Sequence, residues 1–156
     1  MARGALGKKM LRKIRNGEEH LIANDPVRPH IPFEKRVGAG KDIFVLDDGG
    51  DTIRAVICVA YCNEVPTCEH DMELWSQQAV QDGQHGSVAV FYTVWSYDKG
   101  AGREIVLKTK KLLEKETPTT RFVTLSPLTE MARKFHLRNG AKFIAKHFDC
   151  QNFEYV

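Results

Sequence analysis

The sequence predicts an α+β (or α/β) fold, with a mixed β-sheet flanked by helices, and three observations carry this prediction. Apolar, β-branched and aromatic runs typical of strands recur along the chain, between segments whose apolar residues repeat at helical spacing. The predicted order is α, β, β, α, β, α, β, α, β, β, which mixes a hairpin with strand–helix–strand units. The chain has 156 residues, 42% hydrophobic and 28% charged, as expected for one domain with a core.

The first 41 residues are predicted to be a basic helical segment followed by an irregular connector. No acid precedes Glu18, whereas the basic residues there are Arg3, Lys8, Lys9, Arg12, Lys13 and Arg15. The apolar side of an amphipathic helix would consist of Leu6, Met10, Leu11 and Ile14. Prolines and glycines predict a connector at 24–41, so residues 42–156 are expected to form the folded domain. Binding of the basic segment to an anionic partner is the alternative to a solvated helix.

The remaining elements can be predicted in chain order. Strands at 43–46 and 52–62, joined by the turn sequence Asp-Asp-Gly-Gly-Asp, predict a hairpin. The further expected elements are a helix at 70–80, a strand at 87–97, a helix from 105 to about 116, a strand at 120–125, a helix at 128–138, and a strand pair at 141–147 and 151–156.

Composition argues against several classes of protein. A net charge of +3 does not require nucleic acid, and no apolar run approaches the roughly 20 residues of a membrane span. The 4 cysteines are too few for a disulfide scaffold, and no secretory signal is recognisable, so we expect a cytoplasmic protein with reduced thiols. Cys58, Cys62 and Cys68 lack a second close pair at zinc spacing, so we expect no metal site. Association with further copies of the chain is left open.

The segment after the strand at 87–97 is typical of a phosphate-binding turn. It runs Lys99-Gly100-Ala101-Gly102-Arg103 and leads into a helix. Glycines let backbone N–H groups approach a ligand closely, and the start of a helix adds unpaired N–H groups and a positive dipole. Lys99 and Arg103 add formal charge. An ordinary tight turn is the alternative interpretation.

This strand, Gly-x-Gly turn and helix resemble the coenzyme A binding segment of the GNAT acyltransferase superfamily. A more specific resemblance, over about residues 42 to 156, is to the catalytic domain of malonyl-CoA decarboxylases. The matching segments are VFYTV at 90–94, FVTLSP at 122–127, FHLRNGA at 135–141 and NFEY at 152–155.

The resemblance implies a GNAT-like sheet in which the strand at 87–97 splays from the strand at 120–125. That gap would admit the pantetheine arm of a CoA thioester along the free strand edge, so we assign Val94 and Trp95 to cofactor binding beside residues 99–103. It also implies that Ser126 and His136 are a catalytic pair, with malonyl-CoA or acetyl-CoA as the bound thioester.

Decarboxylation of a malonyl thioester develops negative charge on the thioester oxygen, which preorganised donors must stabilise. A histidine of near-neutral pKa could protonate the carbanion or hold the carboxylate, and Ser126 could donate to the carboxylate or carbonyl. The alternatives are a strand-end or capping serine and a partly buried structural histidine. Two other functions stay open: an N-acetyltransferase that uses acetyl-CoA, and a non-catalytic GNAT-fold protein that serves binding or assembly.

Overall fold

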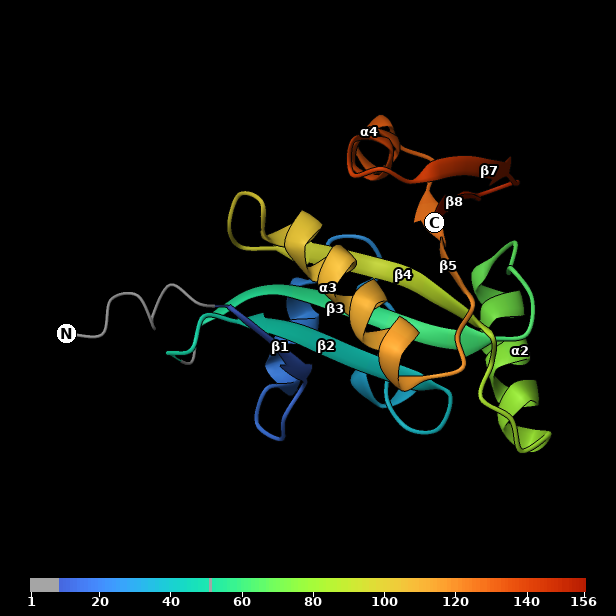
Figure 1. The fold of residues 1–156 in the computed structure, drawn as a ribbon, viewed down its shortest axis with the longest axis horizontal. Coiled ribbons are helices and arrows are strands. Elements are labelled where there is room, and N and C mark those ends of the chain that lie inside the picture. The colour runs from blue at the N-terminus through green and yellow to red at the C-terminus, as the bar shows by residue number, and fades with distance from the viewer. Residues whose placement is uncertain (1–8, 51) are drawn as a thin grey trace.

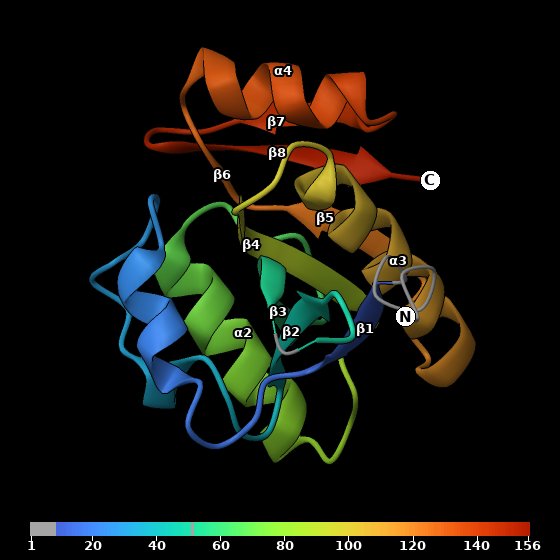
Figure 2. The same ribbon diagram turned by 90° about the vertical axis from the view of Figure 1, so that its left-hand side faces the viewer.

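Eight strands within the described residues form one mixed sheet, and helices lie on both of its faces (Figures 1 and 2). The structure is a computed structural model that describes residues 9–50 and 52–156. The strands are β1 (Met10–Lys13), β2 (Lys41–Asp47), β3 (Ile53–Cys62), β4 (Val88–Ser96), β5 (Arg121–Thr124), β6 (Ser126–Pro127), β7 (Lys142–Lys146) and β8 (Cys150–Tyr155). The helices are η1 (Glu19–Asn24) and η2 (Phe33–Lys35), both 3-10, and α2 (Glu69–Gln81), α3 (Ala101–Glu116) and α4 (Glu130–Arg138). The predicted mixed sheet flanked by helices is confirmed.

The sheet runs in the order β1-β2-β3-β4-β5-β8-β6, with β7 also paired to β8. Only the β4–β5 pair among these described strands is parallel, and it extends from Val88↔Arg121 to Phe91↔Thr124. Beyond Phe91, β4 continues to Ser96. The segment that follows β5 turns away from β4 instead, and its Ser126 pairs with Gln151 of β8. The two strands therefore splay apart, as expected from the sequence.

Alternation along the strands separates the core into two layers. Ile43 and Val45 of β2 face the layer covered by η1 and α2, whereas Phe44 and Leu46 face the layer covered by α3. Successive side chains of a strand point to opposite faces, so one buried strand serves both layers. Figure 2 shows α2 and α3 on opposite sides of the sheet, with α4, β7 and β8 at its far end.

The predicted N-terminal helix is wrong where the structure describes it. Residues Met10–Lys13 form β1, which pairs antiparallel with β2, Leu11 lying opposite Leu46. The open edge of β2 offers backbone partners to this segment, and such a long-range pairing is invisible in the helical spacing of Met10, Leu11 and Ile14. Leu6 lies outside the described residues.

Two further differences concern the connector and α3. The connector is irregular, as predicted, but it is packed into the molecule: Asp25 is 3% and Arg36 0% exposed. The helix expected from residue 105 begins at Ala101, because the glycine turn is its first turn rather than a separate loop. No helix in the described part of the chain is long and apolar enough to span a membrane.

Candidate functional site

A β-bulge bends β4 at the position where its pairing with β5 ends. Cys58 of β3 lies opposite Thr93 and Val59 opposite Phe91, so Tyr92 is an extra residue with no partner in β3. A bulge sharpens the local twist and re-aims the side chains beside it. Leu125 still donates its N–H to the Phe91 carbonyl at 3.2 Å, and the strands separate beyond this bond.

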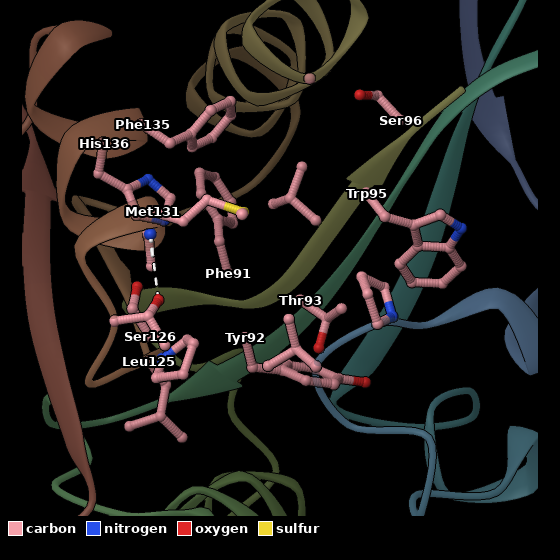
Figure 3. A pocket seen from close by; sticks show the side chains of 17 residues that line it. Phe91, Tyr92, Thr93, Trp95, Ser96, Leu125, Ser126, Met131, Phe135 and His136 are labelled. Atoms are coloured by element: carbon pink, nitrogen blue, oxygen red, sulfur yellow. Dashed lines mark hydrogen bonds between the residues drawn. The ribbon is translucent and has the colours of Figure 1, made fainter. Parts of the chain in front are cut away.

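A cavity of ≈ 660 Å³ lies where the strands have separated. It extends from the bulged half of β4 to α4, with the first turn of α3 and the connector contributing walls (Figure 3). The residues that line it are Pro26, Val27, Phe91, Tyr92, Thr93, Val94, Trp95, Ser96, Gly102, Leu125, Ser126, Pro127, Thr129, Met131, Ala132, Phe135 and His136. None of these described residues is Asp, Glu, Lys or Arg, so the cavity is apolar apart from a few hydroxyls and one imidazole.

Ser126 and His136 line this same cavity, although they come from β6 and α4. Ser126 is 3% exposed, and its hydroxyl donates to Thr124 Oγ1 at 2.8 Å. Thr124 Oγ1 also accepts the Phe153 N–H at 3.0 Å, which ties the serine to β8. The fold thus brings the two predicted residues to one cavity; their catalytic roles stay predictions.

His136 is buried against the C-terminal strand. Its Nδ1 atom is 2.7 Å from Tyr155 Oη, and its ring stacks on Phe153 with centroids 5.5 Å apart. Burial lowers the pKa of His136 to about 4, because the cationic form would lose its hydration. The expected near-neutral pKa is therefore wrong, and the imidazole is neutral at physiological pH in the free protein.

The first turn of α3 borders the cavity through Gly102. Gly100 is its N-cap with φ +85°, and no side chain caps the helix. The first N–H groups of a helix have no partner within it, which leaves this end suited to an anion. Lys99 and Arg103 are exposed beside it, and Arg103 Nη1 donates to Asn139 Oδ1 at 3.4 Å.

The two glycines of the turn serve different purposes. Nothing lies within 4 Å of the position that a Cβ would take on Gly100, so its backbone angle is what requires glycine. A Cβ on Gly102 would meet Phe135 Cε1 at 3.1 Å, so this glycine leaves room for the Phe135 ring of α4 beside α3. Of the predicted cofactor residues, Val94, Trp95 and Gly102 line the cavity. Residues 99–101 and 103 lie on the adjoining turn outside its walls.

No family model matches the sequence, and no curated protein matches it. The structure, however, is similar to malonyl-CoA decarboxylase from Rhodopseudomonas palustris (TM-score 0.67, 14% identity, covering 97% of this chain and 60% of that one). It is also similar to malonyl-CoA decarboxylase from Agrobacterium vitis (TM-score 0.62, 20% identity, 86% and 36%). NAA60 of Arabidopsis thaliana in complex with acetyl-CoA superposes over 96% of this chain and 99% of its own (TM-score 0.63, 10% identity).

The chain has the GNAT fold. It spans 36% and 60% of the lengths of the two malonyl-CoA decarboxylase chains. Sequence identities of 10–20% support only the shared fold. The activity of this GNAT domain therefore has to be inferred from its own residues.

Several residues of this site were not predicted. The sequence singles out Tyr155 only within the NFEY segment and Thr93 only within the VFYTV segment, neither with a role of its own. Pro26 and Val27, assigned to the connector, line the cavity of the GNAT domain. No local pattern marks these residues, because bulges and packed connectors are set by contacts between distant segments.

Proposed function

We propose that this chain is an acyl-CoA-utilising enzyme of GNAT fold that decarboxylates malonyl-CoA to acetyl-CoA and CO2. One observation carries the proposal: Ser126 and His136, from two separate motifs, line one cavity that opens where β4 and β5 splay. Chance similarity of short motifs would not require the fold to bring both side chains to one place.

The coenzyme would lie along the free edge of β4. The backbone from Val94 to Ser96 has no β5 partner, so its polar groups can pair with the amides of pantetheine. The pyrophosphate would then lie at the first turn of α3, where the helix dipole, Lys99 and Arg103 favour an anion. This placement directs the thioester toward the bulge and the cavity.

The cavity suits loss of CO2 for an electrostatic reason. The bond between the α-carbon and the carboxylate breaks, CO2 leaves, and the electron pair moves onto the thioester as an enolate, whose carbon then takes up one proton from solvent water. A carboxylate in apolar surroundings loses hydration, whereas the enolate spreads its charge over carbon and oxygen. Ser126 can donate a hydrogen bond to the departing carboxylate or to the thioester oxygen if its hydroxyl turns away from Thr124 Oγ1, to which it donates in the free protein.

His136 would act as a hydrogen-bond donor, not as a charged acid. Tyr155 retains its proton, because burial raises the pKa of its phenol. If the phenol donates to Nδ1, the proton of the neutral imidazole is on Nε2, free to donate into the cavity. A preorganised neutral donor stabilises an enolate oxygen without the cost of burying a cation.

Acetyl transfer to an amine is the second candidate. It is favoured by the match over nearly the full length of NAA60, which was solved with acetyl-CoA. It ranks lower because the described lining residues include no carboxylate that could hold an ammonium acceptor, and the buried imidazole is a weak base.

Product analysis separates the two. The purified protein is incubated with malonyl-CoA alone, or with acetyl-CoA and a panel of peptide and polyamine amines, and the products are identified by mass spectrometry. The proposal predicts acetyl-CoA formation from malonyl-CoA, reduced about a hundredfold or more in Ser126→Ala and His136→Ala. Acetylated amines without decarboxylation would establish the second candidate instead.

A further inference from the structure

A buried hydroxyl without a partner lies on the cavity wall. Thr93 is 3% exposed, and its Oγ1 atom has no hydrogen-bond partner among the described residues. Figure 3 shows its side chain on the β4 side of the cavity, across from Met131 and His136. An unpaired buried hydroxyl is unfavourable, and a ligand that accepts a hydrogen bond there would relieve it.

Arg28 holds the peptide group beside this hydroxyl. Its Nη1 atom donates to the carbonyl oxygen of Tyr92, and its Nε atom donates to Glu69 Oε2 at 3.0 Å. Because Tyr92 is the bulge residue, it lacks the β3 partner that would otherwise orient it. The peptide is trans and planar, so fixing the Tyr92 carbonyl also fixes the N–H and Cα of Thr93, and with them the direction in which its side chain projects.

A second arginine holds Arg28 in turn. Arg36 Nη2 donates to the Arg28 carbonyl at 2.6 Å, and Arg36 Nη1 donates to Asp25 Oδ2 at 2.6 Å. The other carboxylate oxygen, Asp25 Oδ1, accepts the Arg28 N–H at 2.9 Å. The side chains of Asp25 and Arg36 are 0% exposed, so this buried pair holds the backbone of Arg28 in a fixed position beside the bulge.

We propose that the Thr93 hydroxyl donates a hydrogen bond to the acyl end of the bound CoA thioester, and that Arg28 is the positioning residue that aims it. This inference rests on the proposed binding of a CoA thioester in the cavity. It does not depend on whether the acyl group is then decarboxylated or transferred. The connector becomes part of the acyl site through this contact.

Calorimetric titration with acetyl-CoA and with CoA tests the contact, since only acetyl-CoA carries the acyl oxygen. We expect Thr93→Val to weaken acetyl-CoA binding about fivefold to tenfold, with CoA binding changed less than about twofold. Thr93→Ser, which keeps the hydroxyl, should retain most of the affinity. The melting temperature of free Thr93→Val should not fall, because a methyl replaces an unpaired hydroxyl. If Thr93 were only structural, Thr93→Val would not lose acetyl-CoA affinity selectively while keeping its melting temperature.

Arg28→Met should reproduce the selective loss of acetyl-CoA affinity, and Arg28→Lys should restore part of it through one remaining donor. If Thr93→Val binds acetyl-CoA as tightly as the wild type, the inference is wrong while CoA binding stands. If the wild type binds neither compound, this inference and the proposed function both fail. If the acyl selectivity is found but no CO2 forms from malonyl-CoA, only the decarboxylation fails.

Discussion

The Nδ1 atom of His136 lies 2.7 Å from the hydroxyl oxygen of Tyr155, although the two residues are 19 positions apart and belong to α4 and β8. The contact holds the imidazole ring against the C-terminal strand and selects which nitrogen carries the proton. The chemistry of the histidine therefore depends on a tyrosine that does not line the cavity.

Tyr155→Phe should lower the rate of malonyl-CoA decarboxylation about tenfold, because the imidazole loses the partner that fixes its tautomer. The ¹⁵N chemical shifts of His136 should change from one dominant tautomer toward a mixture. Tyr61→Phe is the matched control, since the Tyr61 hydroxyl donates to Asp42 Oδ2 in another part of the sheet. Equal rates for Tyr155→Phe and the wild type would remove Tyr155 from the mechanism.

Stability should depend on pH through His136. Its folded-state pKa is about 4 against an ordinary 6.5, so between these values the unfolded chain binds the proton and the folded protein does not. The free energy of unfolding should therefore fall as pH falls through this window, by about 2 kcal/mol between pH 7 and pH 5. Urea unfolding at a series of pH values should show a flatter dependence for His136→Gln. A wild-type protein as stable at pH 5 as at pH 7 would contradict the buried neutral imidazole.

Some of this structure could be predicted from the sequence, and the reasons are physical. The run from Val88 to Ser96 is long, β-branched and aromatic, so its local preference agrees with its place at the centre of the sheet. The sequence located a glycine turn after β4 because the requirement of Gly100 for positive φ is local, although α3 begins within that turn, at Ala101. Ser126 and His136 were found only because their motifs resemble those of a known family.

The rest depends on contacts between distant segments. Met10–Lys13 is a strand because β2 has a free edge to pair with it. Tyr92 is a bulge residue because the register between β3 and β4 shifts by one residue there. Gly102 reads as a phosphate-binding glycine, yet the space above it is filled by Phe135. None of these features has a local signal.

The glycines of the turn should respond differently to alanine. Gly100→Ala should lower the free energy of unfolding by about 1 kcal/mol, since alanine is strained at φ +85°. The added methyl meets no protein atom, so a weaker affinity of Gly100→Ala for acetyl-CoA would report on the pyrophosphate proposed to lie at this turn. Gly102→Ala should weaken acetyl-CoA binding by pushing Phe135 toward the cavity. Wild-type affinity in Gly102→Ala would show that the contact between Gly102 and Phe135 does not shape the site.

The buried pair of Asp25 and Arg36 should contribute strongly to the stability of the fold. Asp25→Ala should cost about 3–5 kcal/mol of stability, because it leaves the Arg36 charge buried without its partner. The double variant Asp25→Ala, Arg36→Met should recover part of that loss, as no uncompensated charge remains. Urea unfolding measures both. A single variant as stable as the double variant would mean that the charge is compensated elsewhere.

The central claim, that the cavity between β4 and α4 holds the acyl end of a CoA thioester, is tested most directly by calorimetric titration with acetyl-CoA of two tryptophan variants in α4. Ala132 lines the cavity, whereas Lys134, on the same helix, is exposed and outside its walls. We predict saturable binding to the wild type and to Lys134→Trp, and loss of binding in Ala132→Trp, whose indole would fill the space. Binding of equal affinity to all three proteins, or to none, would contradict the claim.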